Sequence, residues 1–199
     1  TTANDLSYSK DTSTGELTLI ASNFEIRGQS DVAHNLIISG KSNSIYGGDL
    51  ADTIEELNSN CSNNYIYGGS GNDTIILRGG SSAYGEEGDD IFIAYSGVCY
   101  GGIGNDTITR YGGSGVSYGG EGDDVFNIYS SNAKYFGEEG NDTFNIIGSQ
   151  SGIVIDGGSG TNNVTGEVGS NTTINVVGAN SGSVSLVSGE EQSVMINGI

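Results

Sequence analysis

The sequence has little positive charge and few of the residues that mark catalytic or nucleic-acid-binding proteins. Its 199 residues include six Lys and Arg, one His, two Cys and no Pro or Trp, against 25 Asp and Glu, for a net charge of −19. Nucleic acids and anionic membranes are bound through basic patches, so this charge excludes both as partners. No apolar run approaches the roughly 18 residues of a membrane helix, so nothing predicts a membrane span.

Glycine is abundant, with 35 of the 199 positions, and many of these glycines recur at fixed positions of a sequence repeat. The letters YGGSGNDTI from Tyr67 return as YGEEGDDIF from Tyr84, YGGIGNDTI from Tyr100, YGGEGDDVF from Tyr118 and FGEEGNDTF from Phe136. A weaker copy starts at Tyr46 and a decayed one at Asp156, so that successive starts are 21, 17, 16, 18, 18 and 20 residues apart. A period near 18 residues predicts an architecture of stacked coils.

The repeat resembles G-G-x-G-x-D-x-U-x, the calcium-binding nonapeptide of RTX proteins, which bacteria secrete. The resemblance implies an all-β fold, a right-handed parallel β-roll or β-helix solenoid. Two features depart from the family pattern: Glu86 and Glu138 replace the second glycine, and the second half of each coil lacks the motif. We therefore expect Ca²⁺ along one edge of the solenoid only, with about four to six ions stacked there.

The residue types in each copy suit this metal. Glycine turns tightly and can aim carbonyl oxygens at one point. Counted from the first glycine, the sixth position is an aspartate in the five close copies and in the weak copy. Calcium binds about six to eight oxygen atoms of carboxylates and carbonyls, so one loop supplies half a cage and the next coil the rest. The predicted calcium ligands are Asp52, Gly68, Ser70, Gly71, Asn72, Asp73, Gly85, Glu87, Gly88, Asp89, Asp90, Gly101, Ile103, Gly104, Asn105, Asp106, Gly119, Glu121, Gly122, Asp123, Asp124, Gly137, Glu139, Gly140, Asn141 and Asp142.

Short strands follow each aspartate and precede each loop. The apolar eighth position alternates with its neighbours and predicts a buried column of Ile54, Ile75, Phe92, Ile108, Phe126 and Phe144. Each copy begins with an aromatic residue, and the residue before it is small or apolar and is expected to point inward. Because side chains alternate along a strand, the aromatic residues should then form an outward column of Tyr46, Tyr67, Tyr84, Tyr100, Tyr118 and Phe136. Stacking within a sheet explains this column, and a docking strip for sugar or protein is the alternative.

Three segments are predicted. Residues 1–33 form an N-terminal β cap with a hairpin, residues 34–156 the calcium-binding coils, and residues 157–199 a calcium-free C-terminal coil and cap, where Asn162 replaces the aspartate. Cys61 and Cys99 lie about two coils apart, too far for a disulfide, so we expect two free thiols with Cys99 buried. The single histidine, His34, is expected to be structural.

Function follows from charge and repeat. The loop carboxylates repel one another without metal, so folding and calcium binding should be linked. We expect a non-enzymatic, calcium-folded module of a secreted or cell-surface bacterial protein, with a structural, surface or adhesion role and a cell-surface glycan or protein as further partner. The alternatives are an accessory carbohydrate-binding module and a domain inserted in a filament or surface-layer protein. The six basic residues are scattered and form no catalytic constellation.

Overall fold

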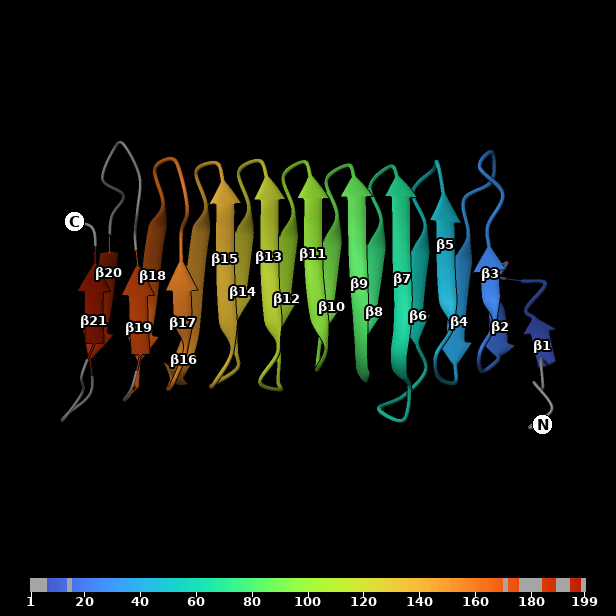
Figure 1. The fold of residues 1–199 in the computed structure, drawn as a ribbon, viewed down its shortest axis with the longest axis horizontal. Helices are drawn as coiled ribbons and strands as arrows, with labels where there is room; N and C mark the ends of the chain where they lie inside the picture. The colour runs from blue at the N-terminus through green and yellow to red at the C-terminus, as the bar shows by residue number, and fades with distance from the viewer. Residues whose placement is uncertain (1–6, 14–15, 170–171, 176–183, 189–193, 198–199) are drawn as a thin grey trace.

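The protein is a solenoid of two facing parallel β-sheets. The computed structural model describes residues 7–13, 16–169, 172–175, 184–188 and 194–197, and these form strands and turns without a helix. In Figure 1 the chain rises through the front sheet, crosses the top, descends through the rear sheet and advances from right to left. This winding is right-handed, as the sequence predicted.

The first sheet has 11 strands among the described residues and the second has 10. The first sheet contains β1 (Ser7–Lys10), β2 (Leu17–Ile20), β4 (Asn35–Ser39), β6 (Thr53–Glu56), β8 (Thr74–Leu77), β10 (Ile91–Ala94), β12 (Thr107–Arg110), β14 (Val125–Ile128), β16 (Thr143–Gln150), β18 (Asn163–Val168) and β20 (Val184–Ser188). The second contains β3 (Glu25–Arg27), β5 (Ser44–Gly48), β7 (Ser62–Ser70), β9 (Gly80–Glu87), β11 (Val98–Ile103), β13 (Val116–Glu121), β15 (Lys134–Glu139), β17 (Val154–Asp156), β19 (Thr172–Asn175) and β21 (Val194–Asn197).

The register of both sheets is the register of the repeat. Ile108 on β12 pairs with Phe92 on β10 and with Phe126 on β14, so that equal repeat positions lie side by side. In the second sheet Tyr100 on β11 pairs in the same way with Tyr118 on β13. Parallel stacking therefore turns each repeat position into a column along the solenoid axis.

The two ends continue this pattern. β1 pairs antiparallel with β2, which is the predicted hairpin, while β2 and β3 pair in parallel with β4 and β5 and so belong to the first coil. At the other end β18 to β21 extend the two sheets in parallel. Both sheets therefore continue past residues 33 and 157, and the division into two caps and a calcium-binding part stays a prediction.

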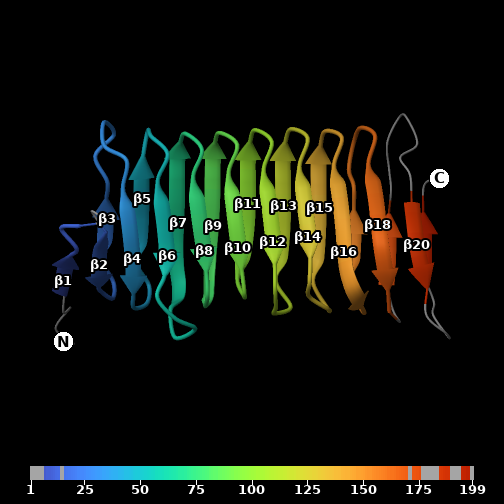
Figure 2. The ribbon, with the colours of Figure 1, turned by 180° about the vertical axis from the view of Figure 1, so that it is seen from behind.

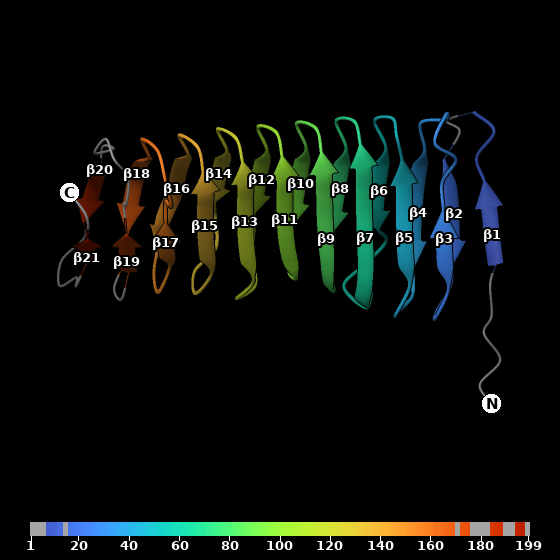
Figure 3. The same cartoon turned by 45° about the horizontal axis from the view of Figure 1, so that its top comes forward.

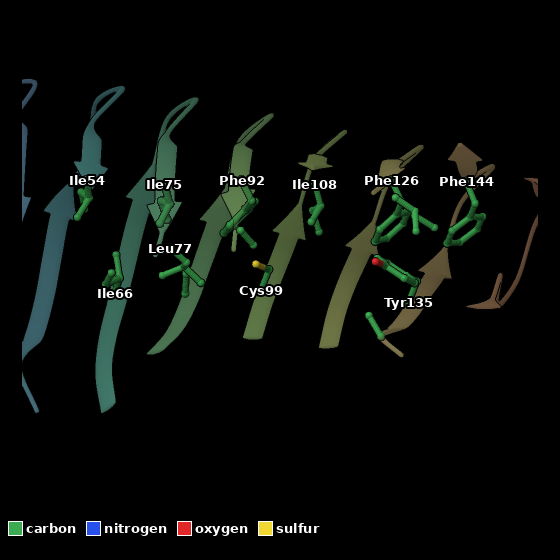
Figure 4. Packing of buried hydrophobic residues seen from close by; sticks show 14 of the residues in the cluster. Ile54, Ile66, Ile75, Leu77, Phe92, Cys99, Ile108, Phe126, Tyr135 and Phe144 are labelled. Carbon is green, nitrogen blue, oxygen red and sulfur yellow. The ribbon is translucent and has the colours of Figure 1, made fainter. Parts of the chain in front are cut away.

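The core lies between the sheets (Figure 4). Ile75, Phe92, Phe126 and the other predicted eighth-position residues are completely buried. Tyr135, which faces them from β15, makes an edge contact with Phe126 at 6.0 Å between ring centroids. Both cysteines are free and Cys99 is buried, as predicted, and Cys61 is buried as well.

The outward aromatic column of the second sheet is also present. Its six rings, from Tyr46 to Phe136, stack with centroids 4.7 to 5.0 Å apart and interplanar angles of 1° to 13°. Their inward neighbours Ile45, Ile66 and Ala83 are buried, which confirms the predicted orientation. Because each ring covers the face of the next, the column exposes ring edges rather than faces.

The repeat loops all lie on one edge of the solenoid. Each runs from a rising strand of the second sheet into the next strand of the first, for example from β11 to β12, and together they form the upper edge, brought forward in Figure 3. We call this the loop edge. The opposite edge holds the turns that lead back, such as the turn after Ala94.

Candidate metal centre

The sixth-position aspartates form one continuous ladder along the loop edge. The main-chain N–H of Asp90 donates a hydrogen bond to Oδ1 of Asp106 at 2.7 Å, and Asp106 donates in the same way to Asp124 at 2.7 Å. Equivalent bonds link the ladder from Asp52 to Asp142. All six side chains are at most 2% exposed, so the ladder lies beneath the surface of the loops.

The second carboxylate oxygen of each aspartate is left without a partner. Oδ2 is buried and makes no hydrogen bond in any of the six ladder residues, which are Asp52, Asp73, Asp90, Asp106, Asp124 and Asp142. A buried carboxylate oxygen without a donor is costly, since ionised oxygen loses its hydration and gains nothing in return. Six such atoms in a row therefore indicate a ligand that the protein atoms alone do not supply.

Each unpaired oxygen faces a cradle that only glycine leaves open. A Cβ atom on Gly101 would lie 2.1 Å from Oδ2 of Asp106 and 2.3 Å from the carbonyl oxygen of Gly119 on the next coil. The same pair of oxygens, one carboxylate and one carbonyl, meets the Cβ position of Gly47, Gly68, Gly85, Gly119 and Gly137. The first glycine of the repeat is therefore required for space between two coils, not only for the turn.

Carboxylate and carbonyl oxygens are the ligands that calcium prefers, and the cradles fit this ion in donor type. Within the described residues no group of three or more His, Cys, Asp or Glu side chains gathers at one point. Transition-metal sites built from such side chains are thus not present in that part of the chain, and a cation at the ladder would depend on backbone carbonyls for most of its ligands.

Burial raises the carboxyl pKa of five ladder aspartates, Asp73, Asp90, Asp106, Asp124 and Asp142. Desolvation is the main cause, the N–H donor opposes it, and the neighbouring carboxylates add to it. The pKa rises to about 7 for Asp90 and to about 8 for Asp124. For Asp73, Asp106 and Asp142 it rises to about 6. Without a cation these five aspartates therefore take up protons at a higher pH than exposed aspartates do.

The other predicted ligand positions are divided between two layers. The N–H groups of the fourth-position glycines donate hydrogen bonds to third-position carbonyl oxygens of the next coil. Gly88 donates to Ile103 and Gly104 donates to Glu121, both at 2.8 Å. The third-position side chains, those of Ser70, Glu87, Ile103, Glu121 and Glu139, lie in one outer column. These side chains are exposed or partly exposed, and they therefore lie apart from the buried ladder.

The fifth position forms a second, exposed ladder in which Asn and Asp alternate. Asn105 donates its N–H and its side-chain amide to Oδ1 of Asp89, and Asn141 does the same to Asp123. Asn72 accepts from the N–H of Asp89. The side chains of Asn72, Asp89, Asn105, Asp123 and Asn141 therefore hold neighbouring loops together at the surface rather than pointing to the buried oxygens.

Four further residues belong to the ladder or its cradles and were not predicted as ligands. His34 occupies the ladder position before Asp52: its N–H donates to Oδ1 of Asp52 at 2.5 Å, and its Nδ1 lies 3.1 Å from the same oxygen. Asn162 ends the ladder by accepting the N–H of Asp142 at 2.8 Å. Gly47 and Gly157 complete the first and last cradles. The weak copy at Tyr46 and the decayed copy at Asp156 were the sequence signals for these two glycines.

The two glutamates that depart from the repeat shape the surface above the ladder. Glu86 and Glu138 have φ of 80° and 78°, a region that favours glycine. Each closes one end of a groove, and the two grooves have volumes of about 410 and 490 Å³. Each groove crosses two coils that have glycine at the second repeat position and ends at a coil that has glutamate there. The shape of the surface above the ladder therefore repeats every three coils.

Comparison with known proteins identifies the repeat. The family model of the RTX calcium-binding nonapeptide repeat (4 copies) matches residues 62–82, which span β7 and the first close copy. Neither the curated proteins nor the solved structures gave a match to the chain. The repeat match and the parallel solenoid together fit an RTX-type β-roll protein and support a calcium-binding β-roll module. No helix in the described residues is long and apolar enough to cross a membrane.

Proposed function

We propose that this chain is a calcium-folded module of an extracellular bacterial protein, with a structural role at the cell surface or in adhesion. The observation that supports this proposal is the column of six buried, unpaired Oδ2 atoms, each opposite a carbonyl oxygen of the next coil. A divalent cation at each cradle supplies the positive charge that these oxygens lack. The ligands would be the ladder aspartates with the loop carbonyls of two adjacent coils.

Electrostatics links this binding to folding. Stacked coils bring the ladder carboxylates to the strand spacing of about 4.8 Å, and their mutual repulsion opposes stacking. Six divalent ions, one per unpaired Oδ2, would add twelve positive charges to a net charge of −19 and leave −7. Because the cradles exist only between stacked coils, the binding energy of the ions contributes to the free energy of folding. RTX proteins are typically secreted, and folding outside the cell is the use we propose for this linkage.

A non-enzymatic role is part of the proposal. Arg110, one of the six basic residues, is completely buried in the core, and Arg78 is paired with Glu55. The outward aromatic column is explained by its own stacking, since its ring faces are covered. Of the alternatives, a domain inserted in a filament or surface-layer protein agrees with the same module, because a rigid solenoid serves equally well as a spacer there.

The direct test is a calorimetric calcium titration of chelator-treated protein, followed by circular dichroism. We expect close to six ions per chain and a gain of β-structure that Mg²⁺ at the same concentration does not give, since Mg²⁺ requires a tighter octahedral site. Sodium chloride at equal ionic strength is the control for simple screening of charge. Full β-structure and an unchanged unfolding midpoint in chelator would refute the proposal.

A further inference from the structure

The outer surface of the first sheet has a region without charged side chains. It consists of three outward residues on each of four neighbouring coils. Two of the three lie on β10, β12, β14 or the first part of β16, and the third is the next outward residue along the chain. These twelve residues, which we call the uncharged face, are Ile91, Ile93, Tyr95, Thr107, Thr109, Tyr111, Val125, Asn127, Tyr129, Thr143, Asn145 and Ile147. Figure 2 shows this sheet from its own side. In a chain with a net charge of −19, such a region requires an explanation.

The uncharged face contains five exposed large apolar side chains, those of Ile91, Tyr95, Tyr111, Tyr129 and Ile147. Tyr95, Tyr111 and Tyr129 form a second tyrosine column, with relative exposures of 44%, 47% and 39%. Their rings stack at centroid distances of 5.5 and 4.8 Å but diverge by 23° at each step, in contrast to the nearly parallel rings of the aromatic column on the second sheet. These tyrosines are contiguous, unlike the singly scattered apolar residues that need no explanation on a protein surface.

Polar groups on the face are ordered before any ligand arrives. The Asn127 amide donates to Oγ1 of Thr109 at 3.2 Å, and the Asn145 amide donates to Oδ1 of Asn127 at 3.1 Å. Each amide N–H₂ carries two donors, so one N–H of each asparagine is left for a further partner. The middle column therefore offers fixed donors between a column of β-branched residues and a column of tyrosines, and a ligand pays little entropy to order them.

The size of the face limits its occupant. Three columns over four strands span about 13 Å along the strands and about 14 Å across them, from the usual rise and spacing of strands. The resulting area, on the order of 200 Å², is well below the roughly 800 Å² per partner of a stable protein complex. A flexible chain of small rings fits this area better than a folded protein or a second copy of this chain.

The charge of the molecule selects among such chains. Polyanions are repelled by the net charge, and polycations would be drawn to the carboxylates of the loop edge instead. An uncharged chain with apolar C–H groups and hydroxyl rims matches the exposed ring edges and phenol hydroxyls, the methyl groups and the amides of these columns. We propose that the uncharged face binds a neutral polysaccharide, which lies across the tyrosine and asparagine columns. The site depends on the proposed function only in that calcium folds the coils that carry it.

The test uses the full chain in saturating calcium, after its β-structure and its calcium stoichiometry have been recorded, so that a failure of folding is seen separately from a failure of binding. The probes are neutral hexasaccharides, namely β-1,4- and α-1,4-linked glucose and β-1,4-linked xylose, with oligogalacturonate as the anionic counterpart. Binding is measured by calorimetry and by amide shifts in NMR spectra. We expect saturable binding of at least one neutral probe and none of the oligogalacturonate.

Three variants locate the site. Tyr111→Ala should weaken binding at least tenfold by removing ring contacts, and Asn127→Asp should weaken it at least tenfold by placing a charge in the face. Tyr65→Ala is the matched control, because Tyr65 is 50% exposed on the second sheet, outside the face. The proposal is overturned if no neutral probe binds, if Tyr65→Ala weakens binding equally, or if sedimentation shows a dimer that Asn127→Asp abolishes.

Discussion

The main-chain N–H of Asp106 donates a 2.7 Å hydrogen bond to Oδ1 of Asp124 on the next coil, while Oδ2 of Asp124 stays buried without a partner. One carboxylate thus performs two separable tasks: Oδ1 fixes the register of the coils, and Oδ2 offers charge to a cation. Asn162 performs only the first, because it accepts the N–H of Asp142 and carries an amide in place of the second oxygen.

The substitutions Asp106→Asn and Asp124→Asn should separate these tasks. An asparagine keeps the register bond, so we expect the strands to form, but it removes the charged ligand. Each variant should bind fewer ions than the unaltered chain, and each should be more stable in chelator by roughly 1–3 kcal/mol, because a buried unpaired charge disappears. Calcium calorimetry and denaturant unfolding with and without chelator measure both effects. Unchanged ion binding in the double variant would contradict the assignment of the ladder.

The cradles predict a steric effect that one glycine should show and another should not. In Gly101→Ala the new Cβ would lie 2.1 Å from Oδ2 of Asp106 and 2.3 Å from the Gly119 carbonyl, so the two coils must move apart. We expect the loss of about 1–3 kcal/mol of stability that overpacking costs, and the loss of at least one ion. Gly80→Ala is the control, since nothing lies within 4 Å of its Cβ position, and should change stability by less than about 0.5 kcal/mol. Equal effects of the two substitutions on calcium stoichiometry would exclude the cradle.

The fold could be predicted because one period governs every coil. Once the copies at Tyr100 and Tyr118 are placed in register, the partners of Ile108 and Phe126 follow, and both are buried as expected. Alternation also places Arg110 inward, two residues after Ile108, yet sequence alone gives no reason to bury a guanidinium. The structure supplies it, since Arg110 donates to the carbonyl oxygens of Gly97 and Val116.

The site could be predicted by residue type but not by direction. The sequence indicates which aspartates and glycines belong to each loop, whereas the division of labour between Oδ1 and Oδ2 depends on how far one coil is displaced from the next. The role of His34 at the start of the ladder is invisible in the same way, because 18 residues separate it from Asp52. The uncharged face was missed because its columns lie on the outward side of short strands, where only the stacking of coils makes them contiguous.

A buried glutamate at the end of β6 gives a prediction that is independent of calcium. Glu56 is completely buried and accepts hydrogen bonds from the main-chain N–H groups of Arg78 and Gly79, from the Asn64 amide and from the Ser81 hydroxyl. Glu56→Gln would turn an amide N–H₂ toward these donors, so we expect a loss of about 2–3 kcal/mol. Urea unfolding measures it.

Its neighbour provides the control for that substitution. Glu55 pairs with Arg78 on the outer side of the same strand and is partly exposed, so Glu55→Gln should cost less than about 1 kcal/mol. Calcium stoichiometry should be unchanged in both variants. If the two substitutions destabilise the protein equally, the buried hydrogen bonds of Glu56 are not what holds this turn.

The raised pKa values of the ladder predict how stability depends on pH without calcium. The ordinary carboxyl value is 3.8, and the folded values are about 7 for Asp90 and about 8 for Asp124. Between pH 4 and pH 8 the folded chain therefore binds more protons than the unfolded chain, and its stability falls as the pH rises. Each pKa unit corresponds to about 1.4 kcal/mol, although neighbouring groups titrate together rather than one by one.

Urea midpoints in chelator at pH 5, 6.5 and 8 should accordingly decrease in that order, and Asp90→Asn with Asp124→Asn should flatten the trend. Saturating calcium should oppose the decrease, because the ion binds the deprotonated carboxylate and so stabilises the state that high pH produces. Stability that rises with pH in chelator would mean that the ladder carboxylates are ionised in the metal-free fold, and that repulsion between them does not oppose the stacking of coils.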